Sequence, residues 1–104
     1  MNKYCLIILS TASKEESRQI TDYLLKEKLI ACGDIIKNQS NYWWKGKIER
    51  EPRYMTFAYS VLSNKEKIIS KVKELHSDET PGIVFNNIDA NKDFLDWIDN
   101  SIKK

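Results

Sequence analysis

The sequence predicts an α+β fold of the ferredoxin-like type, a β-α-β-β-α-β sandwich with an additional C-terminal helix. Its 104 residues fall in the usual range for one domain, and we expect a single domain over residues 1–104. Apolar runs of strand type alternate with helical patterns in that order, and each of the two internal helical patterns opens with a serine-led capping sequence. This order builds an antiparallel sheet with both internal helices on one face. The other face is then wet, or covered by the last helix or by another chain.

The first strand and helix are predicted from local patterns. Residues from Lys3 to Thr11 are rich in strand-forming residues and almost continuously apolar, which favours a strand inside a sheet. Ser13 and Glu16 have the spacing of a capping box, in which each side chain bonds the other residue's amide. The helix that follows should end near Glu27–Lys28, and its apolar stripe consists of Ile20, Tyr23 and Leu24.

A second extended region follows this helix. The apolar run Leu29–Ile36 contains Gly33, and a glycine inside a strand indicates a bulge or a close backbone approach. The polar segment Asn38–Asn41 is expected to break the strand, and Tyr42–Trp44 resumes it. Lys45–Lys47 has the composition of a turn. Residues 35–50 are therefore predicted to form a long hairpin or a strand with a bent extension.

The second half repeats the strand-helix-strand pattern. Large side chains nearly alternate with small ones over Arg53–Leu62, which predicts a third strand. A second capping box at Ser63 and Glu66 begins a helix that should stop near His76. Ile83–Phe85 gives a short fourth strand. Asn91 then caps a last helix with an apolar side that comprises Phe94, Leu95, Trp97 and Ile98.

Charge and composition restrict the partners. Seventeen Lys and Arg against fifteen Asp and Glu give a net charge of +2, with both signs interleaved. No long-range field attracts nucleic acid or an anionic membrane, and neither is expected as a partner. The apolar run Tyr4–Leu9 is too short for a signal sequence or a membrane span, so we expect a cytoplasmic location. Three Trp, five Tyr and three Phe make much of the apolar surface aromatic, which suits interfaces as well as interiors.

Few residues could support catalysis, and no enzyme is expected. The single histidine, His76, lies at a predicted helix end, where the helix dipole favours it. Asp78 and Glu79 could form an acid/base pair, although a solvated turn is the simpler interpretation. The three glycines never form a phosphate-binding loop.

Two further kinds of binding stay open from the residues alone. Cys5 or Cys32 with His76 would give sulfur and nitrogen ligands suited to copper or zinc, but only if folding or assembly brings them together. The segment Arg53–Tyr59 superficially resembles the aromatic third strand of an RNA-recognition motif. Tyr54 occupies the glycine position of that motif, which argues against RNA binding.

Four segments, taken in order and spacing, resemble the CutA divalent-cation tolerance family over nearly the whole chain. They are Ile8–Ala12, Glu27–Cys32, the Tyr-Trp-Trp-Lys-Gly-Lys-Ile run Tyr42–Ile48, and Phe94–Ile98. The resemblance implies a ferredoxin-like subunit in a tight homotrimer, similar in architecture to PII signalling proteins. It also implies a link to divalent-metal tolerance and to copper.

The resemblance transfers two metal-linked positions, Cys32 and His76. His76 begins the segment that corresponds to the family's His-Pro-Tyr-x-x-Pro-Glu motif, where Ser77-Asp78 replaces Pro-Tyr and Gly82 replaces the final Glu. We expect copper or another divalent cation, or a small ligand, to bind at clefts between subunits. The alternative is a metal-independent, PII-like signalling or interaction module. The residues expected beside the cleft are Tyr42, Trp44 and Glu79, and those expected at the subunit interface are Trp43, Trp44, Lys47 and Trp97.

Overall fold

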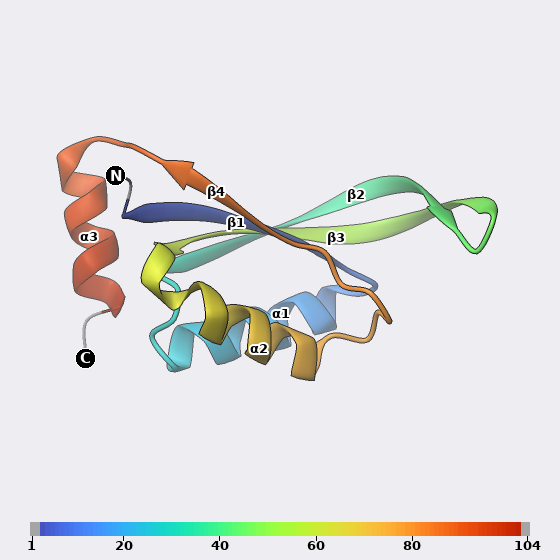
Figure 1. Cartoon of the computed structure of the whole chain (residues 1–104), viewed down its shortest axis with the longest axis horizontal. Coiled ribbons are helices and arrows are strands. Elements are labelled where there is room, and N and C mark those ends of the chain that lie inside the picture. The colour runs from blue at the N-terminus through green and yellow to red at the C-terminus, as the bar shows by residue number, and fades with distance from the viewer. Residues whose placement is uncertain (1–2, 103–104) are drawn as a thin grey trace.

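A computed structural model describes residues 3–102, and its order of elements agrees with the predicted one (Figure 1). A short 3-10 turn, Leu62–Asn64, precedes the second helix. The strands and helices are β1 (Tyr4–Thr11), α1 (Lys14–Lys26), β2 (Cys32–Trp44), β3 (Lys47–Val61), α2 (Lys65–Leu75), β4 (Ile83–Ile88) and α3 (Lys92–Ile102).

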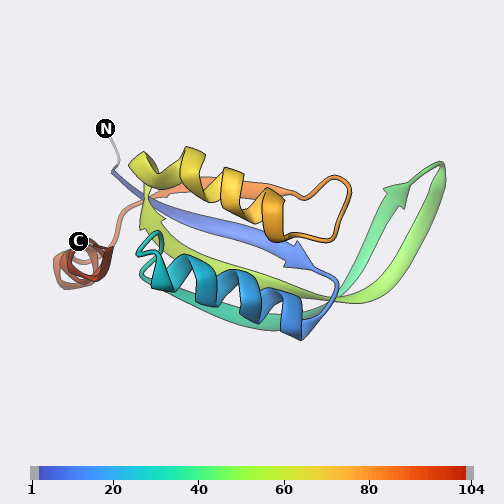
Figure 2. The ribbon, with the colours of Figure 1, turned by 90° about the horizontal axis from the view of Figure 1, so that it is seen from below.

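The four strands form one sheet in the order β2-β3-β1-β4, and every neighbouring pair is antiparallel. α1 and α2 lie side by side on one face of this sheet (Figure 2). α3 stands at one end of the sheet, far from the hairpin of β2 and β3 (Figure 1). This is the ferredoxin-like arrangement with an additional C-terminal helix that the sequence predicts.

The main core lies between the sheet and the helices α1 and α2. Successive residues of a strand point to opposite faces, and the odd-numbered residues of β1 are the buried ones. Each fully buried Ile or Leu contributes roughly 1.5–3 kcal/mol relative to an exposed one. The core residues include Cys5, Ile7 and Leu9 of β1, Ile20 and Leu24 of α1, Ala58 of β3, and Ile68 and Val72 of α2.

A smaller cluster attaches α3 to the end of the sheet face that α1 and α2 leave uncovered. Ile98 is fully buried there with Ala31 and Val61. The rings of Tyr59 and Phe94 meet edge to face, with centroids 5.1 Å apart. α3 therefore covers part of this face.

The rest of that face is accessible and mostly apolar, with exposed Asp34 and Asn86 on its outer strands. Because residues paired directly across antiparallel strands share a face, the register places one set of six apolar side chains together on it. Ile36 is 54% exposed and Val84 49% exposed. We call this set the open face: Leu6, Ile8, Ile36, Met55, Phe57 and Val84.

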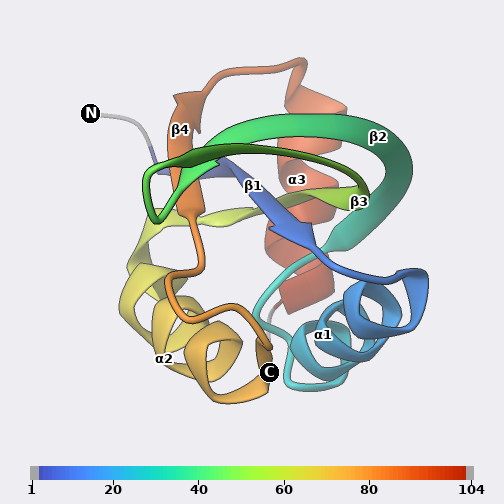
Figure 3. The same cartoon turned by 90° about the vertical axis from the view of Figure 1, so that its right-hand side faces the viewer.

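β2 and β3 continue beyond the sheet as a two-stranded ribbon. β1 pairs with β3 only as far as Tyr54, so residues 38–53 pair with each other alone; we call them the arm (Figure 3). The predicted break at Asn38–Asn41 is wrong, because cross-strand partners such as Arg50, opposite Asn41, keep the polar segment extended. β3 likewise begins at Lys47, earlier than the expected Arg53. 

The arm ends in the predicted turn and tolerates a proline in its ribbon. Lys45 and Gly46 have φ angles of 50° and 81°, as a tight two-residue hairpin loop requires. Pro52 lies where β3 has only β2 beside it, so the side of the strand away from β2 is a free edge.

Of the two predicted capping boxes, the first forms in part and the second does not form. Ser13 Oγ accepts a hydrogen bond from the amide of Glu16, while the Glu16 carboxylate accepts from the amide of Ala12 instead of Ser13. The box at Ser63 is wrong: α2 begins after the 3-10 turn, with Asn64 at its N-cap and no side-chain cap. The Asn64 amide group instead donates to the carbonyl of Leu29 at 3.2 Å, which satisfies a backbone group across the fold.

Candidate functional site

A cleft of about 640 Å³ lies between the arm, the end of β1 and the loop that follows α2. We call residues 76–82 the cleft loop. Tyr42, Trp44 and Glu79, which are expected beside a cleft between subunits, all line this cleft of the single chain. Trp43, Glu51, Arg53 and Asp78 also line it.

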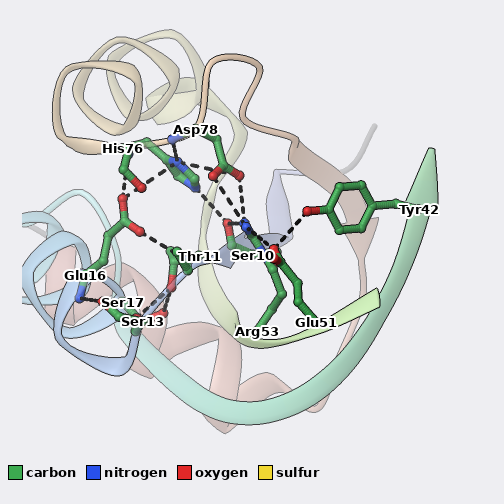
Figure 4. A network of polar contacts seen from close by, with 12 residues as sticks. Ser10, Thr11, Ser13, Glu16, Ser17, Tyr42, Glu51, Arg53, His76 and Asp78 are labelled. Carbon is green, nitrogen blue, oxygen red and sulfur yellow. Dashed lines mark hydrogen bonds and ion pairs between the residues drawn. The ribbon is translucent and has the colours of Figure 1, made fainter. Parts of the chain in front are cut away.

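Arg53 forms the floor of this site. Its side chain is 9% exposed, and each of its five N–H groups has an acceptor (Figure 4). Nε donates to the Ser10 hydroxyl at 2.9 Å, and Nη2 donates to the Ser10 carbonyl at 3.1 Å. Nη2 also donates to Asp78 Oδ2 at 2.7 Å, and Nη1 donates to Asp78 Oδ1 at 3.4 Å and Glu51 Oε1 at 3.3 Å.

This arrangement keeps the guanidinium charged. Burial alone would lower the pKa of Arg53, but the hydrogen bonds and negative charges of Asp78 and Glu51 outweigh it and raise the pKa. The bonds also join three parts of the chain that are far apart in sequence: β1 through Ser10, the arm, and the cleft loop through Asp78.

Aromatic side chains of the arm form the outer wall of the cleft. The Tyr42 hydroxyl donates to Glu51 Oε1 at 2.8 Å, and this hydrogen bond is the main reason that the pKa of Tyr42 is raised. Trp43 is 72% exposed and Trp44 37% exposed. The Lys45 ammonium lies 5.5 Å from the centre of the Trp44 ring, within the range of a cation–π interaction.

His76 lies behind the cleft with a fully buried side chain. Its Nδ1 accepts a hydrogen bond from the amide of Asp78 at 3.0 Å, so the ring proton belongs on Nε2, which donates to the carbonyl of Ser10 at 2.7 Å. Both ring nitrogens are thus engaged by the backbone. In this arrangement His76 positions the cleft loop against β1.

Glu16 holds the beginning of the same loop. Its carboxylate accepts hydrogen bonds from the amides of Ala12 and Ser77, and it lies 3.8 Å from Nδ1 of His76. Burial raises the pKa of Glu16, but these amide bonds and His76 have the larger combined effect and lower it. Glu16 thereby connects α1 to the wall of the cleft.

Cys32 and His76 are not brought together within one chain. Cys32 lies opposite Tyr59, and Tyr59 lies opposite Leu6 of β1, whereas His76 bonds to Ser10. Four residues of strand separate these points, or roughly 13 Å. Among residues 3–102, no group of three or more His, Cys, Asp and Glu side chains could hold a metal ion.

The two cysteines are free thiols in different settings. Cys5 is fully buried, and burial raises its pKa to about 11. Cys32 is partly buried, and burial followed by the charge of Asp34 raises its pKa. A raised pKa disfavours the thiolate that would bind a metal.

The residues predicted at a subunit interface occupy two ends of the molecule. Trp43, Trp44 and Lys47 lie at the end of the arm, and Lys47 is exposed. Trp97 is in α3, at the opposite end (Figure 1); it stacks on Phe94 and stays 44% exposed.

Sequence reasoning missed the centre of the site. Arg53 was expected as the start of a strand that superficially resembles part of an RNA-recognition motif, and Asp78 as part of a solvated turn. The pairing of the Asp78 carboxylate with buried Arg53 was not anticipated. Arg53 and Glu51 are two apart on one strand, where side chains share a face. That spacing of opposite charges was the available signal.

Comparisons with known proteins agree on one family. A family model described as CutA1 divalent ion tolerance protein matches residues 5–101. The divalent-cation tolerance protein CutA of Archaeoglobus fulgidus is 39% identical over 101 residues, which cover 93% of this chain and 96% of that protein. The protein of the same name from Pyrococcus horikoshii is 33% identical over 91 residues, covering 86% and 89%.

Solved structures agree as well. The periplasmic divalent cation tolerance protein CutA from Archaeoglobus fulgidus superimposes with a TM-score of 0.93 at 34% identity, covering 96% of this chain and 99% of that one. The divalent ion tolerance protein CutA1 from Ehrlichia chaffeensis gives a TM-score of 0.92 at 25% identity, covering 100% and 99%.

The comparisons leave the location of this chain as a prediction, since the Archaeoglobus fulgidus protein is described as periplasmic and the sequence predicts a cytoplasmic location here. Within residues 3–102, no helix is long and apolar enough to cross a membrane.

Proposed function

Since the chain belongs to the CutA1 divalent ion tolerance protein family, we propose that it acts as a homotrimer that binds a small ligand in clefts at the subunit boundaries. Membership supports a role in divalent-cation tolerance, and the relatives are named as tolerance proteins, not as enzymes. The observation that carries the proposal is the cleft itself, where Tyr42, Trp44 and Glu79 surround the buried Arg53.

Assembly is supported by two uncovered surfaces. The open face presents six apolar side chains, and an apolar sheet face of this kind normally packs against another layer. The arm adds exposed Trp43 and Ile48 beyond the sheet. A second and a third copy of the chain would bury both surfaces.

The position of the cleft supports ligand binding at a subunit boundary. One wall is the arm, which extends past the chain's own core, and the other is the cleft loop, which Arg53 and His76 fix in place. A volume of about 640 Å³ accommodates a small molecule. A neighbouring subunit that packs on the arm would close the cleft from outside.

Metal binding at Cys32 and His76 remains part of the proposal for the assembled protein. A thiolate and an imidazole suit copper, and subunit assembly could place Cys32 of one chain near His76 of another. This version requires His76 to give up a hydrogen bond to Ser10 or Asp78. It therefore predicts a movement of the cleft loop when metal binds.

A metal-independent, PII-like module is the second candidate. It is favoured by the engagement of both His76 nitrogens and by the lack of a metal-binding cluster among the described residues. In this version the cleft binds a small molecule or a partner's loop, and divalent cations act only indirectly.

Native mass spectrometry tests the assembly. A trimer is expected for the wild-type protein, and Ile36→Lys on the open face should shift it toward monomer because a charge cannot be buried there unpaired. The matched control is Leu75→Lys, which changes another exposed apolar residue, one on α2. A wild-type mass of one chain only would contradict the trimer.

Calorimetric titration separates the two candidates. Copper and zinc salts are titrated into the wild-type protein, Cys32→Ser and His76→Ala. The metal version predicts saturable binding that both variants weaken at least about tenfold. Identical isotherms for all three proteins would favour the metal-independent module.

A growth assay tests the cellular role. Cells that lack their own protein of this family are grown at increasing copper concentrations with the wild-type gene or with Arg53→Met. The wild-type gene should restore growth, and the variant should restore less of it, at equal protein abundance. Growth that does not depend on the gene would contradict a tolerance role.

A further inference from the structure

We propose that the ligand of this cleft is an organic ammonium cation. The inference rests on the proposed function, because it names the chemical class that the proposed cleft would bind. Its basis is the balance of charges, the state of Arg53 and the aromatic wall.

The cleft carries more negative than positive charge. Three carboxylates line it, from Glu51, Asp78 and Glu79, against the single guanidinium of Arg53. Two of these carboxylates already pair with Arg53. Glu79 is exposed and has no hydrogen bond or ion pair to any residue in 3–102, so its charge is available to a ligand.

Arg53 is unable to recruit an anion in this arrangement. All five of its N–H groups are occupied by Ser10, Glu51 and Asp78, and its side chain is almost covered. A phosphate or carboxylate would have to displace Asp78 and then lie beside the freed carboxylate. The buried guanidinium therefore stabilises the walls of the cleft, and the acidic side chains are the groups that would bind a charged ligand.

The arm supplies the groups that hold an organic cation. Tyr42, Trp43 and Trp44 line the cleft, and the negative faces of aromatic rings attract ammonium groups. Trp44 already interacts with the ammonium of Lys45, 5.5 Å from its ring centre. This contact is an internal example of the chemistry that a ligand would use on the same wall.

The size of the cleft and its side chains favour an organic cation over a bare metal ion. About 640 Å³ is far more than one ion requires, and the described side chains include no metal-binding cluster. An alkylammonium group uses the aromatic wall and the carboxylates together, because its carbon atoms contact the rings while its charge faces Glu79.

Titration with choline and its uncharged isostere, 3,3-dimethylbutan-1-ol, tests the inference. The two differ in charge but hardly in shape, and binding is measured by tryptophan fluorescence and by ligand-observed NMR. Choline should bind at least about fivefold more tightly than the alcohol, and added salt should weaken choline binding alone. Glu79→Gln and Trp44→Leu should each weaken choline binding about two- to fivefold.

Asp22→Asn is the matched control, because it removes an exposed negative charge from α1, outside the cleft. It should leave choline binding unchanged. Thermal unfolding of each variant verifies that the fold is retained.

Three outcomes would overturn the inference: no binding of choline, equal binding of the alcohol, or tighter binding of acetate or phosphate. The last two would leave the cleft a ligand site and change only the ligand class. A protein that forms the trimer and restores growth in copper, but binds none of these compounds, would contradict the ammonium ligand alone. The proposals of assembly and of a tolerance role would then be unaffected.

Discussion

Arg53 and Asp78, 25 residues apart in the sequence, meet through two hydrogen bonds, with Nη2 2.7 Å from Oδ2 and Nη1 3.4 Å from Oδ1. This pair joins the arm to the cleft loop. The guanidinium is nearly covered while the carboxylate is 32% exposed, so the arginine depends on the pair more than the aspartate does.

Removal of the carboxylate should therefore destabilise the fold. We expect Asp78→Ala to lower the free energy of unfolding by about 1–2 kcal/mol, because a buried charge loses its main acceptor while Glu51 and Ser10 remain. Urea unfolding at one protein concentration measures it. Asp22→Ala, on an exposed surface of α1, should change the value by less than about 0.5 kcal/mol. Equal effects of the two variants would contradict a structural role for the pair.

Substitution of His76 should loosen the cleft loop. His76→Ala leaves the Asp78 amide and the Ser10 carbonyl without their partner, at a cost of about 1–3 kcal/mol for each group. His76→Gln retains a donor toward Ser10 and should cost less. Hydrogen exchange at the Asp78 amide should accelerate in both variants. Unchanged exchange in His76→Ala would show that the ring does not hold the loop.

The lowered pKa of Glu16 predicts a specific acid sensitivity. A carboxyl group whose pKa is lower in the folded state stabilises the fold above its ordinary value of 4.5, and this contribution is lost as the pH falls through the folded-state pKa. Wild-type stability should therefore decline below about pH 4.5 more steeply than that of Glu16→Gln. Urea midpoints across this range measure the difference. Parallel curves for the two proteins would contradict the role of the Ala12 and Ser77 amides.

Gly33 should not tolerate even one additional carbon. A Cβ atom at this position would lie 2.8 Å from Cγ2 of Thr21, a stiff β-branched side chain on α1. Gly33→Ala is expected to cost about 1–3 kcal/mol through overpacking. Thr21→Ser removes the clashing methyl group, so the double variant should lose less stability than the sum of the single variants. Stability losses that simply add in the double variant would mean that α1 moves away from residue 33 and relieves the clash in that way.

Local patterns predicted the elements that depend on local chemistry. The strand β1 and the Ser13 cap of α1 follow from residues close in sequence, and both were confirmed. Gly33 was also confirmed as a close approach; the one-to-one register around it contains no bulge. These features require no knowledge of the rest of the fold.

The errors arose where distant residues decide the structure. Asn64 bonds the Leu29 carbonyl in preference to capping α2, and a local reading of Ser63 cannot anticipate that partner. The polar segment Asn38–Asn41 stays extended because each of its residues lies opposite a partner on β3. Arg53 became visible as a site residue only when the fold brought Asp78 and Ser10 to it.

If the chain assembles and binds a ligand as proposed, the arm makes ligand binding and assembly parts of one equilibrium. A two-stranded ribbon is marginally stable by itself in water, and residues 38–53 have only each other as strand partners. One wall of the cleft therefore belongs to a ribbon that is marginally stable in a single chain. If contacts with neighbouring subunits order the arm, dilution that separates the subunits also weakens ligand binding. Conversely, a ligand that fills the cleft strengthens the association of the subunits by the same factor. Affinity measured for this protein is then a function of its own concentration.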